Sequence, residues 1–96
     1  MVYNNVLLNV KDVENIQLVA DLLKEQARRS SEEPGCIRFE VYHSKSDAQQ
    51  FILVEQWASE EDLERHKKAK AFIELYLPKV VPLVERHPHM SELIWP

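Results

Sequence analysis

Hydrophobic and polar residues alternate over the first ten positions, as they do in a strand with one buried face. Val6, Leu8 and Val10 share one side of this segment. We therefore predict a strand over Val2–Val10.

The hydrophobic spacing then changes to three or four residues, which is typical of an amphipathic helix. Asp12 precedes the change, and aspartate is one of the residue types that cap the first turn of a helix. We predict a helix from Val13 to about Ser30. Its buried stripe comprises Ile16, Val19, Ala20, Leu23 and Ala27.

Two more strands follow a turn at Pro34 and Gly35, the only glycine of the chain, where we expect a positive φ. The first is Cys36–His43, in which Ile37, Phe39, Val41 and His43 alternate with the remaining residues. After a polar loop over 44–49, Phe51–Trp57 is hydrophobic on both sides, and such a strand needs cover on both faces. Its two sets are Phe51, Leu53 and Trp57 on one face and Ile52 and Val54 on the other.

A second helix is predicted to begin at Ser59, because Ser59 and Asp62 resemble a capping box. The helical pattern continues over Ala69 to about Leu77, and we expect the next prolines, at 78 and 82, to break the chain into short turns. A short final strand is predicted over Pro88–Pro96. Its hydrophobic content is Met90, Leu93, Ile94 and Trp95.

The predicted order of elements is β-α-β-β-α-β, which is the ferredoxin-like arrangement of the α+β class. Two helical segments cover only one face of a four-stranded sheet, whereas Ile52 and Val54 make the other face hydrophobic and Trp95 ends the last strand. An exposed hydrophobic face of this kind marks a partner surface. We therefore expect a symmetric homodimer in which two sheets stack face to face.

Length and composition narrow the classes of function. The 96 residues, 45% hydrophobic and 29% charged, predict one soluble domain over residues 1–96. A net charge of −4 and a pI near 5.5 argue against nucleic acid or an anionic membrane as main partner. The N-terminus lacks the features of a signal peptide or membrane span, and Cys36 has no second cysteine with which to form a disulfide. We expect a cytoplasmic protein.

Three segments carry a more specific pattern: E-P-G-C-I-R-F-E-V-Y (Glu33–Tyr42), F-I-L-V-E-Q-W (Phe51–Trp57) and S-E-E-D-L-E-R-H (Ser59–His66), followed by Phe72. A Pro-Gly turn, an aromatic-rich strand, Glu-x-Trp and then Ser, Leu, His and Phe at these spacings resemble the antibiotic biosynthesis monooxygenase family. The resemblance covers nearly the whole chain.

The resemblance implies a dimeric α/β barrel with a pocket between helices and sheet in each subunit. Many members are described as oxygenating phenolic or quinol substrates with O₂ and without metal, flavin or haem. A relative of similar layout isomerises a phosphorylated signal compound, and a third branch degrades haem. The haem branch places Asn, Trp and His at the positions of Val6, His66 and Tyr76, and all three differ here. Haem degradation is therefore not expected.

A second departure concerns the pocket. Members of the family commonly carry Pro-His immediately before the aromatic residue that matches Phe72, and here these positions hold Lys70 and Ala71. One polar candidate for the pocket is therefore missing from this chain.

Oxygenation without a cofactor needs a base, an apolar pocket and a partner for the developing oxyanion. His66 suits the role of base, because an imidazole titrates near neutral pH. Trp57 is a candidate to wall the pocket and to stack on a planar ring, and Glu55 is a candidate to orient a neighbouring group. The candidate lining residues are Phe39, Phe72 and Tyr76.

Each candidate also has a purely structural interpretation. His66 could be a partly buried helix residue bonded to the backbone, Trp57 a core residue, and Glu55 an interface or salt-bridge residue. His87 and His89 lack a third ligand at suitable spacing, so we expect no metal site. Nothing around Cys36 indicates a low-pKa nucleophile.

Three functions stay open from the sequence. The first is a cofactor-independent monooxygenase that oxidises a small aromatic quinol or polyphenol with O₂. The second is an isomerase of a small phosphorylated carbonyl compound, which would need a lysine of the basic run Arg65–Lys70 to turn inward toward an anion; otherwise that run is a solvated helix face. The third is a non-catalytic dimeric module that binds a small ligand.

Overall fold

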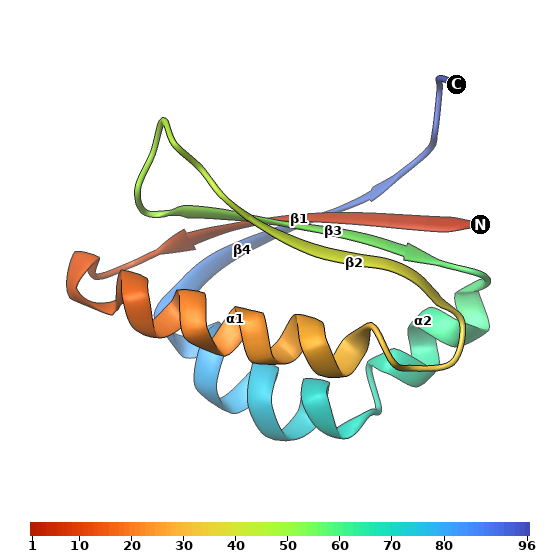
Figure 1. Ribbon diagram of the computed structural model, residues 1–96, viewed down its shortest axis with the longest axis horizontal. Coiled ribbons are helices and arrows are strands. Elements are labelled where there is room, and N and C mark those ends of the chain that lie inside the picture. Colours follow the sequence, from red (N-terminus) through yellow and green to blue (C-terminus); the bar gives the residue numbers. More distant parts are fainter.

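The computed structural model describes residues 1–96 as a four-stranded antiparallel sheet with helices packed on one face (Figure 1). The strands are β1 (Val2–Val10), β2 (Cys36–His43), β3 (Gln50–Trp57) and β4 (Val84–Ser91), in the order β2-β3-β1-β4. The helical elements are η1 (Val13–Asn15), α1 (Ile16–Ser30), α2 (Glu60–His66), the π-helix η2 (Ala71–Val80) and η3 (Val81–Leu83). The predicted ferredoxin-like α+β fold is confirmed.

The hydrophobic core lies between the sheet and the helical layer. Alternate residues of β1 and β3 face the helices, because side chains along a strand point to opposite faces. The main cluster comprises Val6, Leu8, Val10, Val19, Leu23, Phe51, Leu53, Tyr76, Val80 and Val84. A smaller cluster of Phe39, Trp57 and Leu63 fills the end of the sheet next to α2.

Both predicted helix starts are confirmed. The Asp12 carboxylate accepts a hydrogen bond from the Glu14 N–H at 2.9 Å, and the Ser59 hydroxyl oxygen accepts one from the Asp62 N–H at 3.2 Å. The Asp62 carboxylate does not complete a capping box. It accepts hydrogen bonds from the Ser59 hydroxyl and from Arg65 instead, at 2.9 and 2.6 Å.

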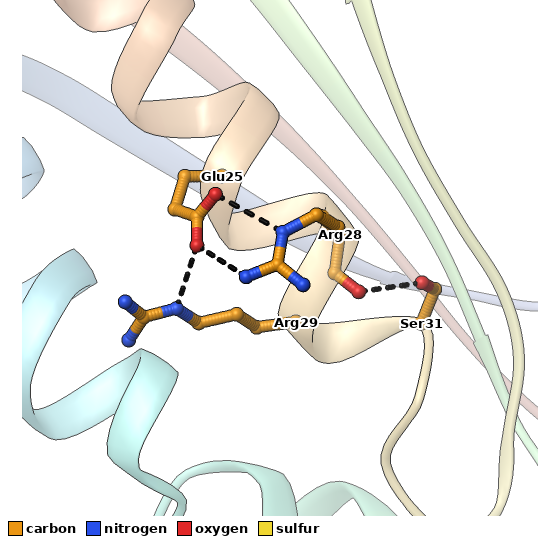
Figure 2. A network of polar contacts seen from close by, with 4 residues as sticks. All are labelled: Glu25, Arg28, Arg29 and Ser31. Carbon is orange, nitrogen blue, oxygen red and sulfur yellow. Dashed lines mark hydrogen bonds and ion pairs between the residues drawn. The ribbon is translucent and has the colours of Figure 1, made fainter.

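The C-terminal end of α1 carries an exposed polar network (Figure 2). Glu25 accepts hydrogen bonds from Arg28 and Arg29, with shortest distances of 2.6 and 2.9 Å. These two hydrogen bonds lower the pKa of Glu25 to about 2, and the bond from Arg28 has the larger effect. The Ser31 hydroxyl donates to the Arg28 carbonyl at 2.9 Å, which satisfies a carbonyl left open at the helix end.

The prediction that Pro78 breaks the helix is wrong, since η2 continues through this residue to Val80. In an α-helix, a proline ring collides with the carbonyl four residues earlier. The hydrogen bonds of a π-helix span five residues, and the wider turn accommodates the ring.

The predicted final strand is displaced along the sequence, because β4 spans Val84–Ser91 and not Pro88–Pro96. The pairing of β1 with β4 ends at Tyr3 opposite Ser91, so the last five residues have no neighbouring strand to bond. We expected Trp95 to add to the hydrophobic outer face of the sheet. This prediction is wrong, because Trp95 lies beyond the end of β4 and is exposed. In Figure 1 this tail rises away from the helices.

The alternation predicted for β2 fails at one position. A β-bulge between Cys36 and Arg38 leaves Ile37 out of register and exposed, so Cys36 and not Ile37 shares the covered face with Phe39.

No helix covers the other face of the sheet (Figure 1). Ile52 lies between Leu7 of β1 and Tyr42 of β2 on this face, and Val54 is the next outward residue of β3. All four are partly or largely exposed, so the hydrophobic outer face predicted from the sequence is present.

Gly35 adopts the predicted positive φ, at +79°. A Cβ atom at this position would lie 2.0 Å from the Cγ atom of Asp62 in the first turn of α2. The turn before β2 can therefore pack against α2 only because residue 35 has no side chain.

We predict that Gly35→Ala destabilises the fold by at least about 1–3 kcal/mol, since it adds backbone strain and a collision with Asp62. Urea unfolding measures the loss. Lys45→Ala, in the exposed loop between β2 and β3, is the control and is expected to leave stability unchanged. A Gly35→Ala variant as stable as the wild type would contradict the proposed packing.

Candidate active site

A cavity of about 330 Å³ lies between the sheet and the helical layer. This volume is at the lower end of the range for small-molecule sites, about 300–1,000 Å³. Every strand except β2 contributes to the lining, together with α1, α2 and η2. The hydrophobic walls include Leu53, Leu63, Phe72 and Met90, and the polar walls include Asn4, Gln26, Glu55, His66, Tyr76 and Arg86.

His66, in the last turn of α2, lines this cavity and is only 3% exposed. Its Nδ1 atom lies 2.7 Å from the Glu33 carboxylate, which belongs to the turn held by Gly35. An ionised carboxylate only accepts hydrogen bonds, so Nδ1 carries the proton of the neutral ring. The other ring nitrogen, Nε2, makes no hydrogen bond within the protein and keeps its lone pair.

Aromatic rings surround this imidazole. The ring centroid of His66 is 4.6 Å from that of Trp57, 5.4 Å from that of Phe72 and 5.8 Å from that of Phe39. The structure thus brings four residues predicted from the sequence into one cluster.

The expected stacking of Trp57 on a substrate ring finds no support in this arrangement. Trp57 is completely buried and does not line the cavity, because Phe39, Leu63 and His66 pack around it. Phe39 does not reach the cavity either. Phe39 and Trp57 therefore pack against the His66 ring without lining the cavity. Phe72 and Tyr76 line the cavity as expected.

Glu55 is a buried carboxyl group on the cavity wall. Its Oε1 atom accepts a hydrogen bond from the Trp57 indole N–H at 3.1 Å. Burial raises the pKa of Glu55, although hydrogen bonds from Trp57 and Asn4 and the nearby positive charges oppose this effect. The site thus favours the neutral, protonated form of this carboxyl group more than water does.

A cationic side chain reaches the cavity from β4. The Nε atom of Arg86 donates a hydrogen bond to the Tyr76 hydroxyl at 2.9 Å, and the guanidinium carbon lies 5.6 Å from the Tyr76 ring centroid. Burial raises the pKa of Tyr76, so the phenol stays neutral. Arg86 forms no salt bridge.

Four polar residues of the site were not predicted from the sequence: Asn4, Gln26, Glu33 and Arg86. Asn4 had a signal, since it shares strand parity with Val6 and Leu8 on the buried face. Gln26 likewise continues the buried stripe, three residues after Leu23. No sequence signal pointed to Glu33 or Arg86, because their roles depend on contacts between distant parts of the chain.

The basic run around His66 faces mainly solvent. Lys67 borders the cavity but pairs with Glu64 at 3.1 Å, and Arg65 pairs with Asp62. Lys68 and Lys70 are exposed and do not line the cavity.

The remaining candidates do not form a site. His87 and His89 are exposed, and no three His, Cys, Asp or Glu side chains come together as metal ligands. Burial raises the pKa of Cys36 to about 11, which keeps the thiol protonated and poorly nucleophilic. None of the helices is both long and apolar enough to cross a membrane.

Several solved structures share this fold. A protein of unknown function from Bacteroides thetaiotaomicron, described as a possible oxidoreductase, has 26% identity and a TM-score of 0.88, with 96% of each chain covered. A proposed antibiotic biosynthesis monooxygenase from Nitrosomonas europaea has 18% identity and a TM-score of 0.85, covering 97% of this chain and 99% of that one. Another, from Deinococcus radiodurans, has 17% identity and a TM-score of 0.84, with coverages of 100% and 97%.

No curated protein matches the chain. A family model, antibiotic biosynthesis monooxygenase, matches residues 1–76, and this segment runs from β1 through Trp57, His66 and Phe72 to Tyr76. The match covers most of the chain and includes all the sequence-predicted site residues, so the protein belongs to the antibiotic biosynthesis monooxygenase family.

Proposed function

We propose that this protein is a cofactor-independent monooxygenase that oxidises a small aromatic quinol with O₂ in the cavity beside His66. Membership of the family supports oxidoreductase activity. The observation that carries the proposal is a buried imidazole whose Nδ1 is held by Glu33 while Nε2 has no protein partner. This is the arrangement that a general base requires.

In the proposed reaction, Nε2 of His66 accepts the proton of a substrate hydroxyl group. The resulting phenolate gives one electron to O₂, and the superoxide and the substrate radical combine to form a carbon–oxygen bond. The peroxide takes up the proton from His66. Loss of water, with the ring hydrogen, then leaves a new carbonyl group. Quinol and O₂ thus become hydroxyquinone and water, and the quinol supplies all the electrons.

Two carboxyl groups assist in different ways. Glu33 orients the imidazole and stabilises the imidazolium that forms when Nε2 takes the proton. Glu55, whose pKa is raised by burial, is suited to donate a hydrogen bond to developing negative charge on the substrate. Phe72, with its ring beside both His66 and Tyr76, supplies an apolar wall for an aromatic ring.

A second candidate is an isomerase of a small phosphorylated carbonyl compound. It is favoured by Arg86, which lines the cavity without a salt bridge and suits a phosphate group. The inward lysine that this function needs is only partly provided, since Lys67 borders the cavity while paired with Glu64. The cavity also has room for the ligand of the third alternative, a non-catalytic dimeric binding module, but the imidazole held by Glu33 favours catalysis over binding alone.

We also propose a homodimer in which the outer sheet faces of two copies stack. The supporting observation is the row formed by Leu7, Ile52 and Tyr42 at the centre of the uncovered face. Burying hydrophobic surface of this kind contributes about 25 cal/mol per Å².

The first prediction of this function concerns oxygen uptake with hydroquinone as substrate. His66→Ala is expected to lower kcat by about 100-fold or more, as loss of a general base does. Glu33→Gln is expected to lower it by about 10- to 100-fold, because the charge that stabilises the imidazolium is lost. The control is Glu32→Gln, an exposed neighbour of Glu33. Unchanged uptake in His66→Ala would remove the role assigned to His66.

A second prediction concerns Glu55 and pH. The pKa of Glu55 is higher in the folded state than in the unfolded chain, where it is about 4.3. Ionisation of the buried carboxyl group therefore costs no folding stability below that pH, and the loss of stability grows as the pH rises toward the folded pKa. In Glu55→Gln the side chain does not ionise, so this loss of stability is absent. The stability of this variant relative to the wild type should therefore rise with pH, by up to about 1.4 kcal/mol per pH unit in that window.

Urea unfolding of both proteins between pH 4 and 8 measures this difference. Glu85→Gln, at an exposed position of β4, is the control and should show no such trend. A difference between Glu55→Gln and wild type that does not change with pH, or that falls with pH, would contradict the burial effect.

A third prediction concerns the dimer. Analytical ultracentrifugation should give twice the chain mass for the wild type and the chain mass for Ile52→Lys, since the lysine places a charge in the stacked faces. Ile73→Lys is the matched control, because Ile73 is 48% exposed on η2, in the helical layer. A monomeric wild type, or a dimer retained by Ile52→Lys, would rule out sheet stacking.

A further inference from the structure

Two buried amide groups on opposite walls of the cavity lack hydrogen-bond partners. Asn4 belongs to β1 and is 8% exposed, and Gln26 belongs to α1 and is 1% exposed. Their side-chain oxygens, Oδ1 and Oε1, are buried without a partner, and both residues line the cavity. Buried polar atoms in native proteins are almost always hydrogen-bonded, so a partner for these two is to be sought in the cavity. Ser30 also has an unpartnered oxygen but does not line it.

The surroundings define which kind of group would satisfy these amides. Asn4 lies opposite Glu55 across the β1–β3 pair, and a hydrogen bond from Asn4 lowers the pKa of that carboxyl group. The side-chain oxygen of Asn4, Oδ1, is a buried acceptor without a donor. The amide of Gln26 has no hydrogen bond in the protein, so it can present either its oxygen or its nitrogen by rotating about the last side-chain bond.

The group that fits must donate a hydrogen bond to Asn4. A carboxylate or a fully ionised phosphate has no proton to donate. An ammonium group has protons, but Arg86, which lines the same cavity without a salt bridge, repels a cation. A neutral hydroxyl group donates to Asn4 and can accept from or donate to Gln26, whichever way that amide is turned.

We propose that Asn4 and Gln26 form a hydroxyl-binding subsite, which selects aromatic compounds with a second hydroxyl group besides the one that His66 deprotonates. This rests on the proposed function for the role of His66. The sheet supplies one amide and α1 the other, so the two bind the hydroxyl group from both sides. The discrimination is strong in principle, because an analogue without the hydroxyl group leaves buried amides unpaired.

The test measures binding without turnover. Hydroquinone and its monomethyl and dimethyl ethers are titrated against the protein under anaerobic conditions, by isothermal calorimetry. The wild type is expected to bind hydroquinone about 10- to 100-fold more tightly than the dimethyl ether. Gln26→Leu and Asn4→Leu are expected to reduce that preference to within about threefold, mainly by weakening the binding of hydroquinone.

Matched variants separate recognition from folding. Gln17→Leu changes an exposed glutamine of the same helix and should keep the preference of the wild type. Gln26→Ala and Asn4→Ala remove each amide group without adding bulk. If the leucine variants fail to fold by circular dichroism, these two must still lower the affinity for hydroquinone by at least threefold.

Each outcome is decisive. A preference that stays unchanged in Gln26→Leu and Asn4→Leu would overturn the subsite and show that water satisfies the two amides. Failure of the wild type to bind hydroquinone, or equal binding of its dimethyl ether, would overturn it as well. Selective binding that depends on the amides, without oxygen uptake in air, would support the subsite and refute the proposed oxygenation, so the two failures are distinguishable.

Discussion

The hydrogen bond between Glu33 and His66 joins two parts of the chain that are 33 residues apart, and the candidate site depends on it. It forms because the turn after α1 packs against the first turn of α2, where a glycine at position 35 is the only residue that fits. The same contact fixes the proton on Nδ1 and leaves Nε2 free. The backbone constraint at Gly35 thus determines which ring nitrogen of His66, on α2, carries the proton.

The sheet provides the second constraint, because its covered face determines where the cavity can form. β1 lies in the interior of the sheet and carries Asn4 toward the helices, next to Glu55 of β3. β4 is the edge strand beyond β1, and an edge strand tolerates Pro88, which cannot donate a hydrogen bond to the ladder. This edge position also brings Arg86 to the wall of the cavity.

Local patterns explain why much of the fold was predictable. Both helix caps, the positive φ of Gly35 and the order of elements depend on residues close in the sequence. The end of β4 was mispredicted because it depends on where β1 ends. Within the site, His66 could be predicted from its spacing to Trp57, but Glu33 could not, since its contact depends on how the turn packs against α2. Trp57 was assigned to a substrate contact because its sequence position does not reveal that other side chains enclose it.

The charges around the cavity determine what kind of ligand it suits. Glu64 neutralises Lys67, and burial favours the uncharged form of Glu55, which leaves Arg86 as the positive charge without a salt bridge. A single guanidinium already bonded to the Tyr76 hydroxyl suits a phenolate that forms transiently, whereas a phosphate dianion calls for more compensating charge. The unpartnered amide oxygens of Asn4 and Gln26 suit hydroxyl groups in the same way. The electrostatics of the cavity therefore favour a neutral polyhydroxylated ring over a phosphorylated compound.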